Sequence, residues 1–129
     1  MTIVLAYVPT AQGEAALTAA IAEAHLRGED LIAINGSKGD AYVDNRFAQP
    51  DQAAAVEDGL KEAGINFSWK QEVGDDPIDA ILEVIEQVQA SLLVIGMRRR
   101  SPAGKLFLGS RAQQLLLNAP CPVLAVKAD

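Results

Sequence analysis

The sequence has few of the residues from which metal centres and catalytic triads are built. Its 129 residues include one cysteine, Cys121, and one histidine, His25. A single cysteine excludes an intramolecular disulfide and fits a reducing compartment. Structural zinc sites need several cysteine or histidine ligands, and a Ser-His-Asp triad needs a histidine beside its serine. We therefore expect no metal site, no catalytic residues and no enzyme.

Long hydrophobic runs are missing as well. Half of the residues are hydrophobic, but no stretch approaches the roughly 18 consecutive apolar residues of a membrane helix. The chain starts directly with a strand-like apolar run, Ile3–Val8, and shows no charged leader or cleavage site before it. We therefore expect no membrane span and a cytoplasmic location. A length of 129 residues fits one domain covering 1–129.

Acidic residues are absent from a long segment near the C-terminus. The net charge of −6 argues against nucleic-acid binding, yet no aspartate or glutamate lies between Gln87 and Ala128. The basic residues of this segment include Arg98, Arg99, Arg100, Lys105 and Arg111. An acidic protein with one basic segment has either a localised anion site or a solvated run of charge there. Spacing alone does not decide between the two.

Hydrophobic periodicity predicts strands and helices in alternation. The runs that read as strands are Ile3–Val8, Leu31–Ile34, Ile65–Lys70, Leu92–Ile95 and Val123–Val126. Helical spacing is found over 10–28, 53–64, 76–88 and 109–118, and the polar stretch 35–50 reads as a connection or lid-like loop. Such alternation gives a mainly parallel sheet with helices on both faces.

The segment Leu92–Val126 combines the features of a phosphate site. Its apolar run ends at Gly96, a basic loop is predicted over Met97–Leu108, and Gly109 and Ser110 begin a helical pattern. Free backbone N–H groups and the helix dipole favour an anion at such a helix start. The first glycine is expected to let the chain turn out of the strand and to let a ligand approach closely.

The same residues carry a resemblance to a known family. Gly96, Gly109 and Ser110 match, at the correct spacing, the Gly-x2-Gly-x9-Gly-Ser/Thr motif of nucleotide-binding universal stress proteins. Arg99 stands at the place of the second glycine. The turn Ala119–Val123, with its Pro-Cys-Pro sequence, is also typical of the family. The chain therefore resembles a universal stress protein.

The resemblance implies a fold, a ligand and an assembly. The fold is an open five-stranded parallel sheet of the Rossmann or flavodoxin-like type, with strand order 3-2-1-4-5 and helices on both faces. Ligands of such sheets bind where the strand order reverses, here between the first and fourth strands. The implied ligand is ATP or AMP, with Mg²⁺ when it is ATP. The implied assembly is a homodimer through the Val123–Val126 edge strand.

Two departures from the family pattern bear on this ligand. Val8 stands where nucleotide-binding relatives usually carry an aspartate that hydrogen-bonds the ribose, a loss of about 1.5–3 kcal/mol for a bond to a charged group. Arg99 either pairs bidentately with a phosphate or fills the phosphate site and mimics the ligand. After the second strand, Asn35 and Gly36 offer an amide and a backbone group to a base edge.

The candidate nucleotide- or phosphate-binding residues are Gly96, Arg98, Arg99, Gly109, Ser110, Pro9, Thr10, Asn35 and Gly36. A P-loop, Gly-x4-Gly-Lys-Ser/Thr, is absent. Two functions remain open. The first is a regulatory module that binds an adenine nucleotide or a related phosphate anion, with any hydrolysis slow and incidental. The second is a nucleotide-independent interaction protein in which Arg99 occupies the former phosphate site.

Overall fold

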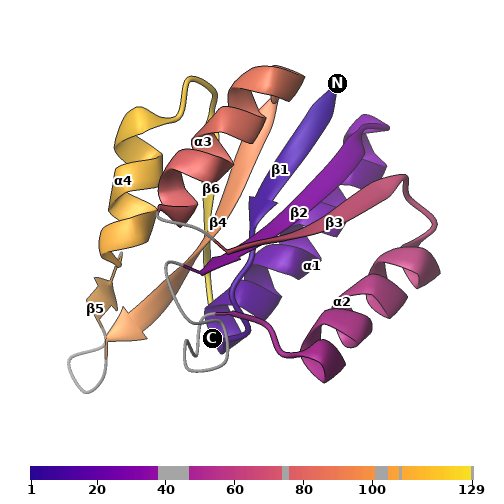
Figure 1. Ribbon diagram of the computed structural model, residues 1–129, viewed down its shortest axis with the longest axis horizontal. Coiled ribbons are helices and arrows are strands. Elements are labelled where there is room, and N and C mark those ends of the chain that lie inside the picture. The colour runs from indigo at the N-terminus through magenta and orange to yellow at the C-terminus, as the bar shows by residue number, and fades with distance from the viewer. Residues whose placement is uncertain (38–46, 74–75, 101–104, 108, 129) are drawn as a thin grey trace.

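The computed structural model describes residues 1–37, 47–73, 76–100, 105–107 and 109–128 (Figure 1). The chain alternates strands and helices, as the hydrophobic periodicity predicts. The elements are β1 (Thr2–Ala6), α1 (Ala11–Arg27), β2 (Asp30–Ser37), α2 (Pro50–Ala63), β3 (Phe67–Val73), α3 (Pro77–Val88), β4 (Leu92–Arg100), β5 (Lys105–Phe107), α4 (Ser110–Asn118) and β6 (Val123–Lys127). No helix in the described part of the chain is long and apolar enough to cross a membrane.

The parallel strands have the spatial order β3-β2-β1-β4-β6. This confirms the predicted order 3-2-1-4-5, because β6 is the fifth of the predicted strands. In the register, Ile3 of β1 lies opposite Leu31 of β2 on one side and Leu92 of β4 on the other. The strand order therefore reverses between β1 and β4, and the C-terminal ends of these two strands form the switch point of the sheet.

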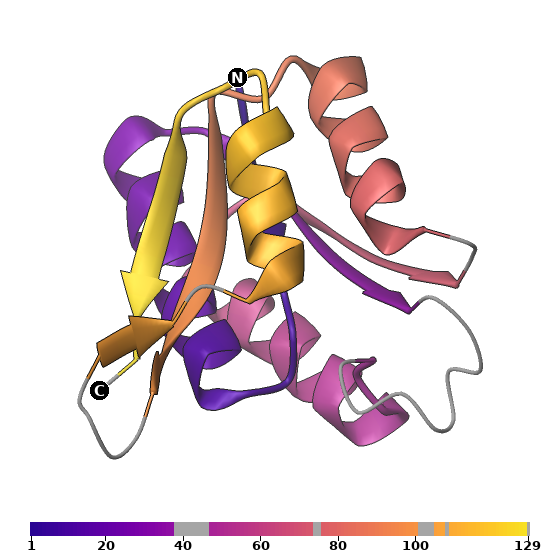
Figure 2. The same ribbon diagram turned by 90° about the vertical axis from the view of Figure 1, so that its left-hand side faces the viewer.

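Helices cover both faces of the sheet (Figure 2). Successive strand residues point to opposite faces, so each strand feeds two separate cores. On one face, α1 and α2 pack over a core that includes Ile3, Leu5 and Leu31. On the other face, α3 and α4 pack over Val4 and Ile34 with their strand neighbours. These strands are apolar on both sides, which is why their sequences read as continuous hydrophobic runs.

The helix ends follow the local sequence signals. The Thr10 hydroxyl accepts a hydrogen bond from the Gly13 amide at 3.1 Å and caps α1, and Asp76 accepts from the Ile78 amide at 2.9 Å and caps α3. Gly28, with φ of 65°, ends α1 in the left-handed conformation that favours glycine. Each of these ends was predictable from a few neighbouring residues.

Part of the basic segment forms a β-hairpin, so the prediction of a loop over Met97–Leu108 is wrong. β4 continues to Arg100, and its last three residues pair antiparallel with Lys105–Phe107 of β5. This pairing satisfies backbone N–H and C=O groups that a loop would leave to water. The partner strand, rather than the strand propensity of three arginines, extends β4. Residues 101–104 and 108 lie outside the described residues.

β2 is also longer than predicted. It runs through Asn35 and Gly36 to Ser37, where these residues pair with β3, so the connection predicted to begin at Asn35 begins later. The prediction ended the strand at Ile34 because the residues that follow are polar. Polar residues can still belong to a strand when hydrogen-bond partners are nearby. Residues 38–46 lie outside the described residues.

Candidate functional site

A cavity of about 600 Å³ lies at the switch point, beyond the C-terminal end of β1 and beside β4. Its walls come from the ends of β1 and β2, from the middle of β4, from the first turn of α1, and from the first two turns of α3 and α4. This is the place where open α/β sheets bind ligands. The volume falls within the range of small-molecule sites.

Much of the cavity wall is apolar. Ile34 lines it from β2, Ile78 and Ile81 from α3, Ile95 from β4 and Leu115 from α4. An apolar ring system that leaves water for this part of the cavity gains about 25 cal/mol for each Å² buried. The α3 residues were missed by the sequence reasoning, because their spacing marks them only as the buried face of a helix.

The first turn of α4 lies at the cavity without a side-chain cap. Gly109 is its N-cap residue and Ser110 its first residue, and both line the cavity. Among the helices in the described ranges, α4 alone has no side-chain cap, since Thr10 caps α1, Asp76 caps α3 and a capping box closes α2. The backbone donors of an uncapped first turn are available to an anion, which the helix dipole also attracts.

Arg111 adds a full positive charge to this end of the cavity. It follows Ser110 in α4, is partly buried, and is the one charged residue among those described as lining the cavity. The cavity therefore has an apolar part and a positive end, which suits a ligand with a ring and an anionic group. Arg111 belongs to the basic segment of the sequence but was not predicted to be a site residue. Its position directly after the motif serine was the available signal.

Gly96 has a different role from the one its motif suggests. β4 does not turn at Gly96 but pairs there with Val126 of β6, so the predicted exit from the strand is wrong. A Cβ atom built on Gly96 would lie 2.4 Å from the Gln12 carbonyl oxygen and 2.8 Å from its carbon. Glycine is required here because the start of α1 packs directly against the β4 backbone. Gly96 also lines the cavity.

Gly109 shows the opposite behaviour. Its φ is −62°, which any residue adopts, and a Cβ atom built on it would meet no described atom within 4 Å. No described residue therefore requires glycine at this position. A methyl group there would be added to the lining of the cavity without meeting a described atom.

The turn after β1 and the first turn of α1 bring three further residues to the cavity: Val8, Thr10 and Gln12. The turn is tight, because a Cβ atom on Gly13 would lie 1.7 Å from the Val8 carbonyl oxygen. The isopropyl group of Val8 forms no hydrogen bonds, so this wall lacks the ribose-binding carboxylate of the family pattern. Gln12 was not predicted, since no motif marks it.

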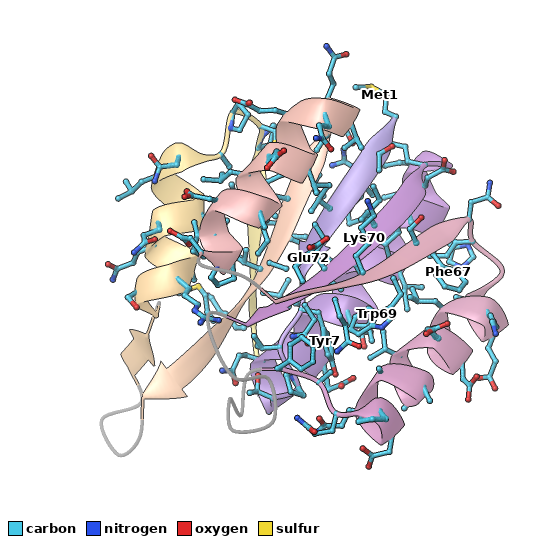
Figure 3. All side chains as sticks on the ribbon, in the orientation of Figure 1. Met1, Tyr7, Phe67, Trp69, Lys70 and Glu72 are labelled. Carbon is cyan, nitrogen blue, oxygen red and sulfur yellow. The ribbon has the colours of Figure 1, made fainter. Side chains whose placement is uncertain are left out.

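Tyr7 lines the cavity and also belongs to the hydrophobic core. Its backbone N–H donates to the Ile34 carbonyl at 2.8 Å, and its hydroxyl donates to the carboxylate of Glu14 in α1. The Tyr7 ring meets the Trp69 ring edge to face, with centroids 5.7 Å apart (Figure 3). Burial, together with the hydrogen bond to Glu14 and its negative charge, raises the pKa of Tyr7 well above its usual value. The phenol therefore stays protonated and holds α1 to β1.

Asn35 is buried away from the cavity, so it is not placed where a base edge could meet it. Its Nδ2 donates to the Tyr7 carbonyl at 2.9 Å, and its Oδ1 accepts from the Ala48 amide at 2.6 Å and from Gln71 Nε2 at 3.3 Å. The residue has no exposed surface. Asn35 instead ties β1, β3 and the start of α2 together.

The structure brings together five of the nine predicted site residues: Thr10, Gly36, Gly96, Gly109 and Ser110. Pro9 and Asn35 do not line the cavity. Arg98 and Arg99 lie in the paired part of β4, but their side chains fall outside the described residues, and with them the role predicted for Arg99. Among the described residues, no group of histidine, cysteine and acidic side chains is arranged to hold a metal ion.

Cys121 and His25 do not line the cavity. His25 is exposed near the end of α1. Cys121 is partly buried just before β6. Burial raises the pKa of its thiol, and the hydrogen bond from the Leu93 backbone opposes this only in part. The thiol is therefore protonated near neutral pH, which makes it a poor nucleophile.

A parallel sheet of order 3-2-1-4-5, with a cavity at its switch point and an uncapped helix start beside it, defines a Rossmann-like α/β protein. The universal stress protein family matches residues 1–127, and the chain belongs to that family. A universal stress protein of Mycolicibacterium smegmatis is 47% identical over 125 residues, which cover 97% of this chain and 96% of the relative. A universal stress protein of Thermus aquaticus is 31% identical, with 98% of each chain covered.

Solved structures show the same fold. A universal stress protein from Archaeoglobus fulgidus has a TM-score of 0.79 and 27% identity, covering 98% of this chain and 97% of that one. Another structure from the same organism contains dAMP, with a TM-score of 0.73, 22% identity and 98% and 96% coverage. A universal stress protein in complex with cAMP has a TM-score of 0.72, 24% identity and 100% and 98% coverage. At these identities, the two nucleotide complexes share the fold with this chain.

Proposed function

We propose that this chain is a regulatory module that binds an adenine nucleotide, or a related phosphate anion, in the cavity at the switch point. The observation that carries the proposal is the division of the cavity into an apolar part and a positive end. Ile34, Ile78 and Ile81 suit a base, and the uncapped first turn of α4 with Arg111 suits a phosphate. The dAMP and cAMP complexes of proteins with this fold support the same ligand class.

The proposal is for binding rather than catalysis. The lining residues include no histidine and no carboxylate within the described ranges, so hydrolysis of a bound nucleotide would be slow and incidental. When the ligand is ATP, Mg²⁺ accompanies its phosphates. Occupancy would change the surface around the cavity and so the protein partners that the domain meets in the cytoplasm during a stress response.

Calorimetric titration of nucleotide-stripped protein tests this proposal. We expect micromolar binding of ATP with Mg²⁺ or of AMP, and about 10- to 100-fold weaker binding for Ser110→Ala, which removes a hydrogen bond to a charged phosphate. Gly109→Ala should also weaken binding, because its methyl group would be added to the cavity lining without meeting a described atom. Ser68→Ala, at an exposed position in β3, is the matched control and should bind as the wild type does. An absence of heat with folded protein, for ATP, AMP and phosphate alike, would remove the proposal.

A nucleotide-independent interaction protein is the second candidate function. Two observations favour it: Val8 lines the cavity where the family pattern has an aspartate, and Arg99 replaces the second motif glycine. In this case the Arg99 side chain fills the phosphate space. Arg99→Gly separates the two functions, since a self-filled site gains nucleotide affinity on substitution and a site that uses Arg99 as a phosphate anchor loses affinity.

We further propose a homodimer through the edge strand β6. Within the described residues, β6 pairs on one side only, with β4, and its residues Val123–Val126 are partly exposed. An apolar edge strand with unpaired backbone groups tends to pair with another chain. Light scattering at micromolar concentration should therefore give about twice the 13.7 kDa chain mass. A mass of one chain across that concentration range would contradict the dimer.

A further inference from the structure

Gln12 is a polar residue of the cavity whose side chain has no partner within the described part of the chain. It lies in the first turn of α1, is partly buried, and lines the cavity. Its carboxamide forms no hydrogen bond or ion pair with any other described residue. A carboxamide both donates and accepts hydrogen bonds, so a half-buried one facing a binding cavity is a group with unused bonding capacity.

The position of Gln12 is fixed by the packing of α1 against β4. A Cβ atom built on Gly96 would lie 3.1 Å from Gln12 Cβ and closer still to the Gln12 backbone. Gln12 therefore sits over the crevice between β1 and β4. The apolar wall of Ile34 and Ile78 lies toward β2 and α3, and Ser110 lies at the start of α4.

This arrangement places the middle of a ligand beside Gln12. A nucleotide with its base against the apolar wall and its phosphate at the start of α4 spans the crevice with its sugar. Other side chains near the crevice are less suited to a sugar hydroxyl. Val8 is apolar, Thr10 already accepts from the Gly13 amide, and the Tyr7 hydroxyl is bonded to Glu14.

We infer that Gln12 is a specificity-determining residue, whose carboxamide binds a sugar hydroxyl of the nucleotide. The inference rests on the proposed function and names the part of the ligand that this residue recognises. The bond is between neutral groups, so its loss weakens binding by about three- to tenfold. Preference for ribose over deoxyribose then depends on Gln12 rather than on a carboxylate at position 8.

The experiment crosses one substitution in the protein with one deletion in the ligand. Wild type and Gln12→Ala are titrated with AMP, 2′-deoxy-AMP and 3′-deoxy-AMP. The four affinities for one protein substitution and one missing hydroxyl form a thermodynamic cycle, which gives the interaction between Gln12 and that hydroxyl. We expect Gln12→Ala to weaken AMP binding three- to tenfold. The affinity for the deoxynucleotide that lacks the contacted hydroxyl should stay unchanged. Gln114→Ala, at an exposed position on α4 outside the cavity, is the matched control and should change no affinity.

A conservative variant gives a second readout. Gln12→Glu keeps an acceptor for the hydroxyl but adds a negative charge near the phosphate. We expect it to bind every nucleotide more weakly than the wild type while keeping the preference for AMP over the sensitive deoxynucleotide. Loss of that preference, with binding retained, would contradict the hydroxyl contact.

The outcomes separate this inference from the function on which it rests. If Gln12→Ala binds AMP as the wild type does, or weakens AMP and both deoxynucleotides equally, the inference is wrong and the proposed function stands. If the folded wild type binds no nucleotide, the proposed function fails and the inference fails with it. Thermal unfolding of each variant shows that its fold is intact before titration.

Discussion

Replacing Gly96 with alanine is expected to destabilise the protein in the absence of any ligand. The added methyl group would lie 2.4 Å from the Gln12 carbonyl oxygen, a backbone atom that cannot move without the whole start of α1. Overpacking of this kind costs about 1–3 kcal/mol or more, and the rigid neighbour places Gly96→Ala at the upper end. Urea denaturation measures the effect as a lower midpoint with an unchanged slope.

Two other glycines supply the controls for this prediction. Gly59 lies inside α2 with no described atom within 4 Å of an added Cβ, so Gly59→Ala should raise stability by about 0.5–1 kcal/mol. Gly109→Ala should change stability by about 1 kcal/mol or less, while it weakens ligand binding. If Gly96→Ala unfolded at the wild-type midpoint and lost only nucleotide affinity, Gly96 would serve the ligand, as its motif suggests.

The contrast between these glycines shows where the sequence stops being informative. Both Gly96 and Gly109 belong to one motif. Nothing in the sequence distinguishes a glycine that leaves space for a ligand from one that leaves space for a packed helix. The close contact of Gly96 involves Gln12, which is far away in the chain. A contact of this kind depends on the finished fold, and local patterns do not contain it.

The parts of the fold that could be predicted have local causes. Strand and helix periodicity depends on residues that are close in sequence, and so do the caps at Thr10 and Asp76. The errors concern strand partners, which the periodicity within a single segment does not reveal. β5 extends β4 through the arginine run, and β3 holds β2 in the sheet past Ile34. The same holds for the site: motif residues of α4 were predicted, whereas Gln12 and the α3 wall needed the fold.

Asn35→Leu is expected to have the second large effect on stability. Leucine keeps the branched shape of the Asn35 side chain but removes the bonds to the Tyr7 carbonyl and the Ala48 amide, which are both part of a buried network. Each buried backbone group left without a partner costs about 1–3 kcal/mol, so we expect a loss of about 2–5 kcal/mol. Asn118→Leu is the control, because Asn118 is exposed and bonds only within its own helix; it should stay within about 0.5 kcal/mol.

Asn35→Asp tests the same network through pH. A protonated aspartic acid can donate to the Tyr7 carbonyl and accept from the Ala48 amide, as the asparagine does. An ionised one cannot donate, and burial raises its pKa in the folded protein. The folded state then binds more protons than the unfolded state, so stability relative to the wild type is greatest below the unfolded pKa of about 4 and falls as pH rises. Urea midpoints of both proteins at pH 4 and pH 7 give the difference. A difference that does not grow with pH would mean that Asn35 is not the donor that holds β1 in place.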